Sequence, residues 1–262
     1  MEKEGKYIYC IIATSQERNF GPIGIGEGGE EVLTISYDEL SMVVSNFPMG
    51  KPEVGRQNLL AHEKIIEEVM KEFNSVLPVR FGTISSSAEE IRNLLDRRYR
   101  EFKTALRDMD HKIELGVKGV WKNMDVIFKE IVEENKDIKK MKEKLQSFAV
   151  QAKREVGKMV AEALEKKKEK EAEKFADALR RTAVNYKQNK TMGDAMFMNA
   201  AFLVDKGREK EFDNIMDDLS EEYSAKGGSA SGGKDRVKFM YAGPLPVFNF
   251  VNIVIYPEEW EK

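Results

Sequence analysis

The feature that most constrains the fold is a long stretch, residues 131–188, with no proline and a single glycine, Gly157. Helix-breaking residues are therefore nearly absent from it, and apolar side chains recur at steps of three and four residues, as in a heptad-like amphipathic helix. The stripe consists of Ile138, Met141, Leu145, Phe148, Ala152, Val156, Met159 and Ala163, and then of Phe175, Leu179 and Ala183. One continuous helix would extend roughly 85 Å at 1.5 Å per residue with little to pack against. We therefore predict a helical hairpin or a pair of broken helices, with the break near Gly157 or in the charged run 166–171.

Strand-like and helix-like patterns alternate before this stretch. We predict strands at residues 7–13, 32–36, 40–45, 76–81 and 113–121, and helices at 57–73 and 87–106. The second helix begins with the capping-box pattern Ser87-Ala-Glu-Glu90. Pro78 lacks a backbone donor, so its segment is expected at a sheet edge or at a strand start. These elements predict an α+β domain of ferredoxin-like character over residues 1–125.

The chain returns to mixed structure after the helical stretch. The patterns predict a buried strand at 195–204, a helix at 210–223, a Gly/Ser linker at 226–233, and extended segments at 237–241 and 248–254. We therefore predict an α+β protein of two domains. Residues 1–125 form the first. Residues 126–262 form the second, with long helices at about 131–188 and a strand–helix–strand part at about 195–256.

Charge and hydropathy narrow the class of partner. Lys+Arg is 43 and Asp+Glu is 46, a net charge of −3, which gives no global basic field and argues against a nucleic-acid partner. No apolar run approaches the 18 residues that a membrane span needs, so no membrane partner is expected. The first residues carry charges without an apolar core, so we predict no signal peptide and a cytoplasmic location.

The side chains that usually carry catalysis are scarce. The single cysteine, Cys10, lies in an apolar strand and is interpreted as an inert core thiol. His62 is expected at the surface or as a helix cap, and His111 has no nucleophile beside it. Residues 24–29 match G-x-G-x-x-G but lack the strand directly before and the helix directly after that a dinucleotide site requires, so they are interpreted as a loop. We predict no enzyme activity, no cofactor and no metal site.

Two basic features allow competing interpretations. Arg80, between two apolar residues, could present its guanidinium to a partner or an anion. A half-buried ion pair with a carboxylate such as Glu114 is the preferred interpretation. The lysine run 166–170 could contact anionic lipid or RNA, but interleaved glutamates cancel its field, so a solvated helix face is preferred.

Four separated segments together resemble the gas vesicle protein family GvpF/GvpL. They are the opening strand Tyr7-Ile-Tyr-Cys-Ile-Ile, the segment Leu77-Pro-Val-Arg-Phe-Gly-Thr83, the strand Glu114-Leu-Gly-Val-Lys-Gly-Val-Trp121, and Asn199-Ala-Ala-Phe-Leu-Val204, which is followed by Gly243-Pro-Leu-Pro-Val-Phe-Asn-Phe-Val251. Their order and spacing cover nearly the whole chain. Val247 and Phe248 stand where family members often have a second proline and a tyrosine, which bears on the contacts of that terminal segment.

The resemblance implies a non-enzymatic accessory or minor structural protein of gas vesicles that acts in vesicle assembly, located at the vesicle and in the cytoplasm. It implies two kinds of partner, the hydrophobic major shell protein and other accessory vesicle proteins. Prolines inside apolar extended segments lead us to expect a sheet edge or groove as the binding surface. The expected partner-binding residues are Pro78, Arg80, Phe81, Pro244, Pro246 and Phe248. The alternative is a small-ligand-binding regulatory α+β module.

Overall fold

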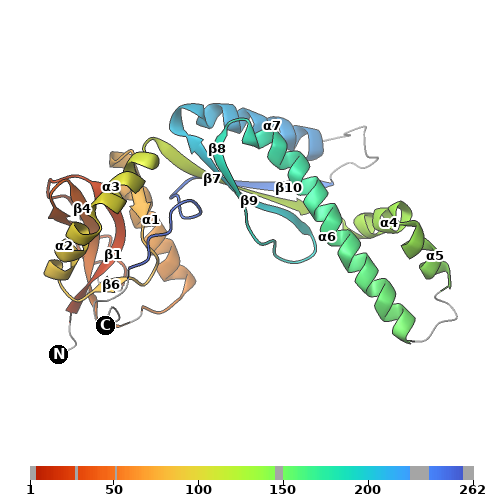
Figure 1. Ribbon diagram of the computed structural model, residues 1–262, viewed down its shortest axis with the longest axis horizontal. Coiled ribbons are helices and arrows are strands. Elements are labelled where there is room, and N and C mark those ends of the chain that lie inside the picture. Colours follow the sequence, from red (N-terminus) through yellow and green to blue (C-terminus); the bar gives the residue numbers. More distant parts are fainter. Residues whose placement is uncertain (1–3, 27–28, 51, 145–149, 225–235, 256–262) are drawn as a thin grey trace. The chain divides into compact units, whose positions relative to one another are not determined.

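The structure is a computed structural model that describes residues 4–26, 29–50, 52–144, 150–224 and 236–255. Its elements mix helices and strands, which confirms the predicted α+β class (Figure 1). Contacts divide the chain into two compact units: unit 1 combines Met1–Glu114 with Pro244–Lys262, and unit 2 is Leu115–Gly243. The terminal segment thus packs with the N-terminal residues. That residues 1–125 and 126–262 form two separate domains stays a prediction.

Unit 1 is built around a sheet whose central strand, β1 (Glu4–Ala13), is buried on both faces. The strand order is β2-β3-β4-β1-β5, and β6 also pairs with β1. The other strands are β2 (Asn19–Gly21), β3 (Val32–Tyr37), β4 (Leu40–Pro48), β5 (Val76–Pro78) and β6 (Ile84–Ser85). β5 is the edge strand of this order, so Pro78 lies where a missing backbone donor is tolerated, as predicted.

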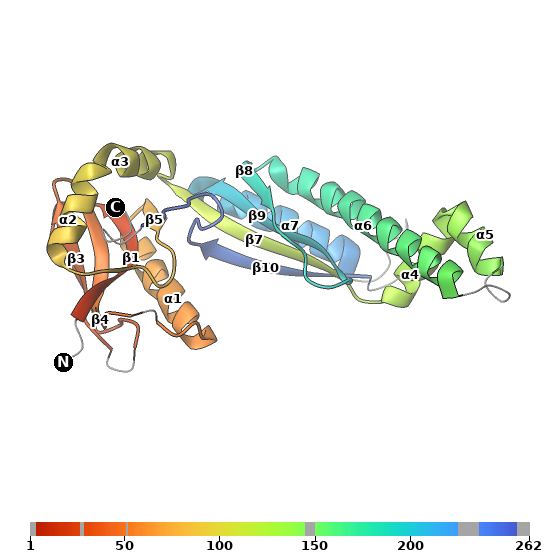
Figure 2. The same ribbon diagram turned by 60° about the horizontal axis from the view of Figure 1, so that its bottom comes forward.

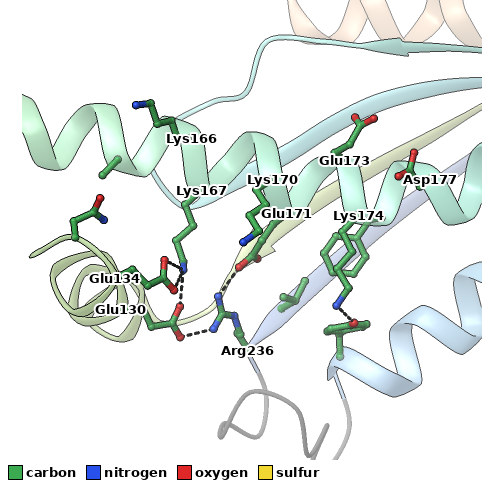
Figure 3. A pocket seen from close by; sticks show the side chains of 15 residues that line it. Glu130, Glu134, Lys166, Lys167, Lys170, Glu171, Glu173, Lys174, Asp177 and Arg236 are labelled. Carbon is green, nitrogen blue, oxygen red and sulfur yellow. Dashed lines mark hydrogen bonds and ion pairs between the residues drawn. The ribbon is translucent and has the colours of Figure 1, made fainter.

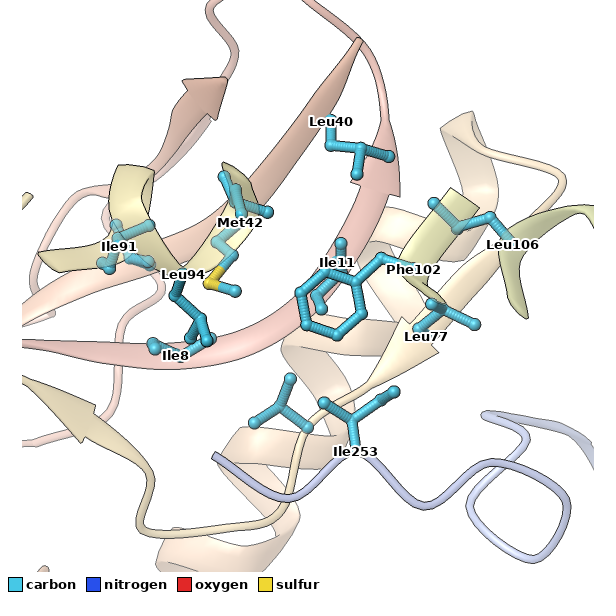
Figure 4. Packing of buried hydrophobic residues seen from close by; sticks show 13 residues of the cluster. Ile8, Ile11, Leu40, Met42, Leu77, Ile91, Leu94, Phe102, Leu106 and Ile253 are labelled. Atoms are coloured by element: carbon cyan, nitrogen blue, oxygen red, sulfur yellow. The ribbon is translucent and has the colours of Figure 1, made fainter. Parts of the chain in front are cut away.

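Side chains that alternate along β1 enter two different cores. Ile8 and Ile11 lie in a cluster with Leu94 and Phe102, from α2 (Ala88–Arg97) and α3 (Tyr99–Asp108) (Figure 4). Tyr7 and Tyr9 enter the other cluster, with apolar residues of α1 (Arg56–Glu72). Because helices cover both faces, β1 reads as a nearly continuous apolar run rather than as an alternating strand.

The predicted cap at Ser87 forms at the start of α2, with the reciprocal bond to Glu90 coming from the residue before the cap. Ser87 Oγ accepts a hydrogen bond from Glu90 N at 3.1 Å, and the Glu90 carboxylate accepts one from Ser86 N at 2.6 Å. The single helix predicted at 87–106 is wrong, because the structure has two helices that meet at Arg98 (φ −106°, ψ 18°). Both helices bury apolar residues in the same core, so tertiary packing determines this break, which local propensity does not reveal.

We expect Ser87→Ala to lower the free energy of unfolding by about 1 kcal/mol, because the Glu90 amide loses its acceptor at the helix start. Urea unfolding followed by circular dichroism measures the change. Ser87→Asp is the matched control, since aspartate is an equally good cap, and it should retain the wild-type stability. An alanine variant as stable as the wild type would contradict the capping role.

Unit 2 contains a four-stranded sheet of order β10-β7-β9-β8 (Figure 2). Its strands are β7 (Lys112–Trp121), β8 (Ala183–Gln188), β9 (Met196–Asp205) and β10 (Val237–Leu245). Two helices pack on it, α6 (Val150–Arg180) and α7 (Glu209–Ser224), the latter after a short 3-10 turn, Lys206–Arg208. Phe175 of α6 contacts the rings of Phe197 and Phe239, and Phe212 of α7 contacts those of Phe202 and Tyr241. These aromatic contacts hold both helices against the strands.

The helical stretch is broken, as predicted, but not where predicted. It comprises α4 (Met124–Glu134), α5 (Lys136–Lys144) and α6, and both shorter helices contact α6. Gly157 and the charged run 166–171 lie inside α6, where nothing crowds the glycine. One break lies at Asn135, and residues 145–149, which include Leu145 and Phe148, lie outside the described residues.

Two boundary predictions are wrong for reasons of pairing. The helical region does not extend to residue 188, because 183–188 form β8, antiparallel to β9. Residues 248–254 are not a continuous extended segment: the amides of Phe250 and Val251 both bond to Val247 O, which makes a turn. The predicted linker 226–233 lies outside the described residues.

Candidate functional site

The two segments predicted to bind a partner lie side by side in unit 1. Val79 and Ile253 form a parallel β-bridge, and Arg80 Nη2 donates to Asn252 Oδ1 at 3.1 Å. Phe248 places its ring 6.2 Å from the His62 ring, centroid to centroid. Residues 78–82 and 246–253, far apart in sequence, therefore form one continuous structure.

The six predicted partner-binding residues differ in exposure. Pro78 and Pro246 are buried and Phe81 is half-buried, whereas Arg80, Pro244 and Phe248 are exposed. Pro244 lies in β10, an edge strand of the second sheet order. Their role in binding stays a prediction. The exposed members are the ones that a partner can reach without unfolding the segment.

The prediction that Arg80 is half-buried is wrong, because the residue is exposed. Glu114, its predicted partner, lies buried in β7 and accepts hydrogen bonds from Asn249 N at 2.8 Å and Asn249 Nδ2 at 2.6 Å. These contacts attach the terminal segment to β7. Charge alone did not predict them, because the donor is an amide distant in sequence.

His62 is predicted at the surface or as a helix cap, and both predictions are wrong: the N-cap of α1 is Gly55, and only 3% of His62 is exposed. Its Nε2 lies 3.1 Å from Val79 O, and its Nδ1 lies 3.0 Å from the Tyr7 hydroxyl, which accepts a hydrogen bond from Gly82 N at 2.9 Å. A carbonyl can only accept, so Nε2 carries the proton and Nδ1 accepts from Tyr7. The neutral imidazole thus links α1 to both ends of the turn 79–82.

The surroundings of His62 keep it neutral. The rings of Tyr7, Tyr9, Phe81 and Phe248 lie within 6.2 Å of its ring, centroid to centroid. Burial lowers the pKa of His62 from 6.5 to about 4, against the opposing effect of its hydrogen bond to Val79. The sequence did hold a signal: His62 precedes Ile65, Ile66 and Val69 by three, four and seven residues, so it belongs to the buried stripe of α1.

The remaining chemical candidates in unit 1 are structural. Cys10 is fully buried and burial raises its thiol pKa, which fits the predicted inert core residue. In the loop containing Gly24, the Ile25 amide donates to the Tyr9 hydroxyl at 2.8 Å and the next element is a strand. The context of a dinucleotide fingerprint does not form there.

An exposed apolar surface lies at the start of α1, and we call it the α1 patch. It consists of Leu59 and Phe248, which are 43% and 40% exposed, while Val54 and Leu60, 78% and 53% exposed, are further exposed apolar residues near the start of the helix. Leu59 lies three residues before His62 on the helix, and Phe248 contacts the His62 ring. The patch thus joins the helix to the terminal segment that contains the predicted residues.

A second candidate site is a charged cleft in unit 2, of about 1090 Å³. It lies between α4, α6, the end of α7 and the start of β10 (Figure 3). Its charged lining residues are Glu130, Glu134, Lys166, Lys167, Lys170, Glu171, Glu173, Lys174, Asp177 and Arg236. Its volume is slightly above the roughly 300–1000 Å³ that is typical of ligand sites.

A chain of ion pairs crosses one end of this charged cleft. Lys167 Nζ lies 3.1 Å from Glu130 and 2.8 Å from Glu134, while Arg236 pairs with Glu130 and Glu171. Trp121 Nε1 donates to Glu171 at 2.6 Å. Burial alone would raise the pKa of Glu130, but the hydrogen bonds from Arg236 and Lys167 lower it overall. The network ties α4, α6 and β7 to Arg236, the residue directly before β10.

Across the described ranges, no three His, Cys, Asp or Glu side chains group in a way that could hold a metal ion. In the same residues, no helix is long and apolar enough to cross a bilayer.

Comparison with known proteins decides the family. A family model described as gas vesicle synthesis protein GvpL/GvpF matches residues 5–252. The chain belongs to the GvpL/GvpF family. The resemblance inferred from four sequence segments is thereby confirmed, and the chain is a gas-vesicle-associated protein.

Relatives of known identity match the GvpL/GvpF chain over its length. Gas vesicle protein F1 of Halobacterium salinarum is 27% identical over 258 residues, covering 98% of this chain and 97% of that protein. Gas vesicle protein F of Microcystis aeruginosa is 23% identical and covers 95% and 99%. The crystal structure of GvpF from Anabaena sp. PCC7120 superposes with a TM-score of 0.79 at 20% identity, covering 96% and 100%, and shows the same fold.

Proposed function

We propose that this GvpL/GvpF protein is an accessory protein that acts in gas vesicle assembly by binding the small, hydrophobic shell protein. The observation that carries the proposal is the family match over residues 5–252. A gas-facing wall needs subunits with a strongly apolar face, and such subunits aggregate in water. A protein that covers this face until the subunit joins the wall would prevent the aggregation.

The α1 patch is our candidate for the surface that covers the shell subunit. It offers Leu59 of α1 together with Phe248, next to the exposed residues Arg80 and Asn252. Pro78 and Pro246 are the buried members of the two segments, and Phe81 packs against His62. An apolar centre with a polar edge is the composition of protein-binding surfaces.

We expect the double variant Leu59→Ser/Phe248→Ser to reduce binding of purified shell protein by about tenfold or more, since two exposed apolar anchors are lost. Co-sedimentation with the shell protein measures the binding. Met192→Ser is the control, because Met192 is 77% exposed but lies in unit 2, and it should bind like the wild type. Equal binding by all variants would contradict the α1 patch. Failure of the wild type to bind would contradict direct contact with the shell protein.

The remaining parts of the proposal concern the whole vesicle. We propose that the protein also contacts other accessory vesicle proteins, is located at the vesicle and in the cytoplasm, and catalyses no reaction. Deleting the protein and scoring flotation of the cells tests the assembly role. The alternative, a small-ligand-binding regulatory module, has the charged cleft as its physical candidate. A multi-degree thermal shift with a nucleotide or an amino acid would favour it.

A further inference from the structure

The terminal segment of unit 1 is held at its end and, separately, at the turn that carries Phe248. At the end, Val79 forms a parallel bridge with Ile253, and Arg98 Nη1 donates to Val254 O at 2.8 Å. These contacts lie several residues beyond Phe248. The position of that ring therefore depends on what holds the turn itself.

A buried carboxylate holds the turn. Glu114 is 4% exposed, and its two oxygens accept from one residue: Oε2 from Asn249 N at 2.8 Å and Oε1 from Asn249 Nδ2 at 2.6 Å. Hydrogen bonds to an ionised carboxylate are stronger than those between neutral groups. Two such bonds to a single residue fix its orientation as well as its place.

The surroundings of Glu114 make a carboxylate an expensive choice for stability alone. Its neighbours in β7, Ile113 and Leu115, are buried and apolar. Burying a charge among apolar side chains costs free energy that an apolar residue would not. What the carboxylate supplies is direction, because apolar packing does not orient the residue that it touches.

Phe248 lies between two residues that are both fixed. Val247 is 3% exposed, and Asn249 is bonded to Glu114. The Phe248 side chain nevertheless remains 40% exposed, with its ring 6.2 Å from that of His62, centroid to centroid. An exposed aromatic ring on a fixed backbone is a preorganised anchor, because a partner need not order the backbone when it binds.

We propose that Glu114 is a positioning residue of the α1 patch: through Asn249 it holds Phe248 beside α1, in the arrangement that the shell protein binds. Leu59, the other member of the patch, is fixed by the helix that contains it. The inference rests on the proposed function and deepens it. It assigns a role in partner binding to a buried side chain that the partner does not reach.

The test exchanges the two polar groups of this contact in the full chain. N249D places a second carboxylate against Glu114, so two acceptors face each other and the side-chain bond is lost. E114Q/N249D restores the contact with the roles reversed. The new amide donates from Nε2 to the new carboxylate and accepts the backbone N–H of residue 249 with Oε1. The double variant also has the net charge of the wild type.

We expect N249D to weaken shell-protein binding about threefold to fivefold, as much as F248S does alone. E114Q/N249D should bind within about twofold of the wild type, since the contact is restored. N249D/F248S should bind like F248S, because the contact acts through the Phe248 ring. A purely structural role would add its own loss to that of F248S, so this comparison distinguishes the two roles.

The matched control is N19D, which makes the same substitution at an exposed position of β2, at the opposite end of the sheet order from β5. Asn19 Oδ1 accepts from Gly21 N at 2.7 Å, and aspartate can accept the same bond. This variant should bind the shell protein within about twofold of the wild type.

Hydrogen exchange reports the state of the turn without the partner. Amides of residues 247–251 should exchange about tenfold faster in N249D and return to the wild-type rate in E114Q/N249D, while β1 keeps its protection. If β1 also loses protection, N249A, which only deletes the side-chain donor, replaces N249D with smaller changes expected in the same direction.

The outcomes separate this inference from the proposed function. Wild-type binding by N249D despite a faster-exchanging turn, or an unchanged exchange rate in N249D, would overturn the positioning role alone. So would a double variant that does not regain binding, or a further loss in N249D/F248S. Failure of the wild type to bind the shell protein would instead overturn the proposed function, and the positioning role with it.

Discussion

Replacing Phe102 with alanine is expected to lower the free energy of unfolding of unit 1 by about 3–5 kcal/mol. The Phe102 side chain is fully buried at the centre of the cluster that joins β1, β4, β5, α2 and α3 (Figure 4). Truncation removes its contacts with Ile11 and Leu77 and leaves a cavity that secondary structure on several sides prevents from collapsing.

Hydrogen exchange of the β1 amides measures this effect within unit 1, because these amides exchange only when the central strand opens. Phe102→Leu is the matched control: it keeps most of the apolar volume and should lose about 1 kcal/mol. The Arg98 guanidinium lies 4.7 Å from the centre of the Phe102 ring, so the alanine variant also loses that contact. Protection of β1 unchanged in the alanine variant would contradict the central position of this ring.

The elements that could be predicted from sequence are those whose signals are local. The amphipathic period of α1, the cap at Ser87 and the edge position of Pro78 all appear in the structure. Each depends on neighbours a few residues away, through helical spacing or through the missing donor of proline. Local rules were sufficient there because tertiary packing acts in the same direction.

The errors arise where distant residues decide the outcome. The apolar spacing of the helical stretch continues to Ala183, but residues 183–188 become β8 because they pair with β9. Arg80 was assigned a carboxylate partner, yet Asn252 of the terminal segment accepts its hydrogen bond. No spacing rule connects positions so far apart in sequence, so only the folded chain reveals these contacts.

The two candidate sites differ in how far the sequence could have indicated them. The segments containing Phe81 and Phe248 were both selected, but their proximity follows from the bridge between Val79 and Ile253. The charged cleft was missed because lysines and glutamates alternate along α6 and appear neutral in sequence. In the structure the lysines and glutamates have different surroundings: Glu130, Glu134 and Glu171 form ion pairs, while Lys170 lines the cleft.

Lowering the pH from 7 to 4 is expected to destabilise unit 1 by about 3 kcal/mol through His62 alone. The unfolded chain takes up a proton on this residue near pH 6.5, whereas burial holds the folded-state pKa at about 4. Above pH 6.5 neither state holds this proton, so the contribution of His62 to the free energy of unfolding is constant there. Because the unfolded state binds the proton more tightly, the free energy of unfolding falls by about 1.4 kcal/mol per pH unit between pH 6.5 and pH 4. Protonation would also remove the acceptor that Nδ1 offers to Tyr7.

The measurement is the pH dependence of unfolding in the wild type and in His62→Gln, which keeps a donor for Val79 O but does not titrate. Carboxylates titrate in both proteins, so the difference between the two curves isolates the histidine. His111, whose side chain is 62% exposed, supplies the control: His111→Gln should retain the wild-type slope between pH 4 and 6.5. If His62→Gln kept that slope as well, the imidazole would not be the neutral link between α1 and the turn 79–82. The position of the terminal segment against that turn would then need another cause.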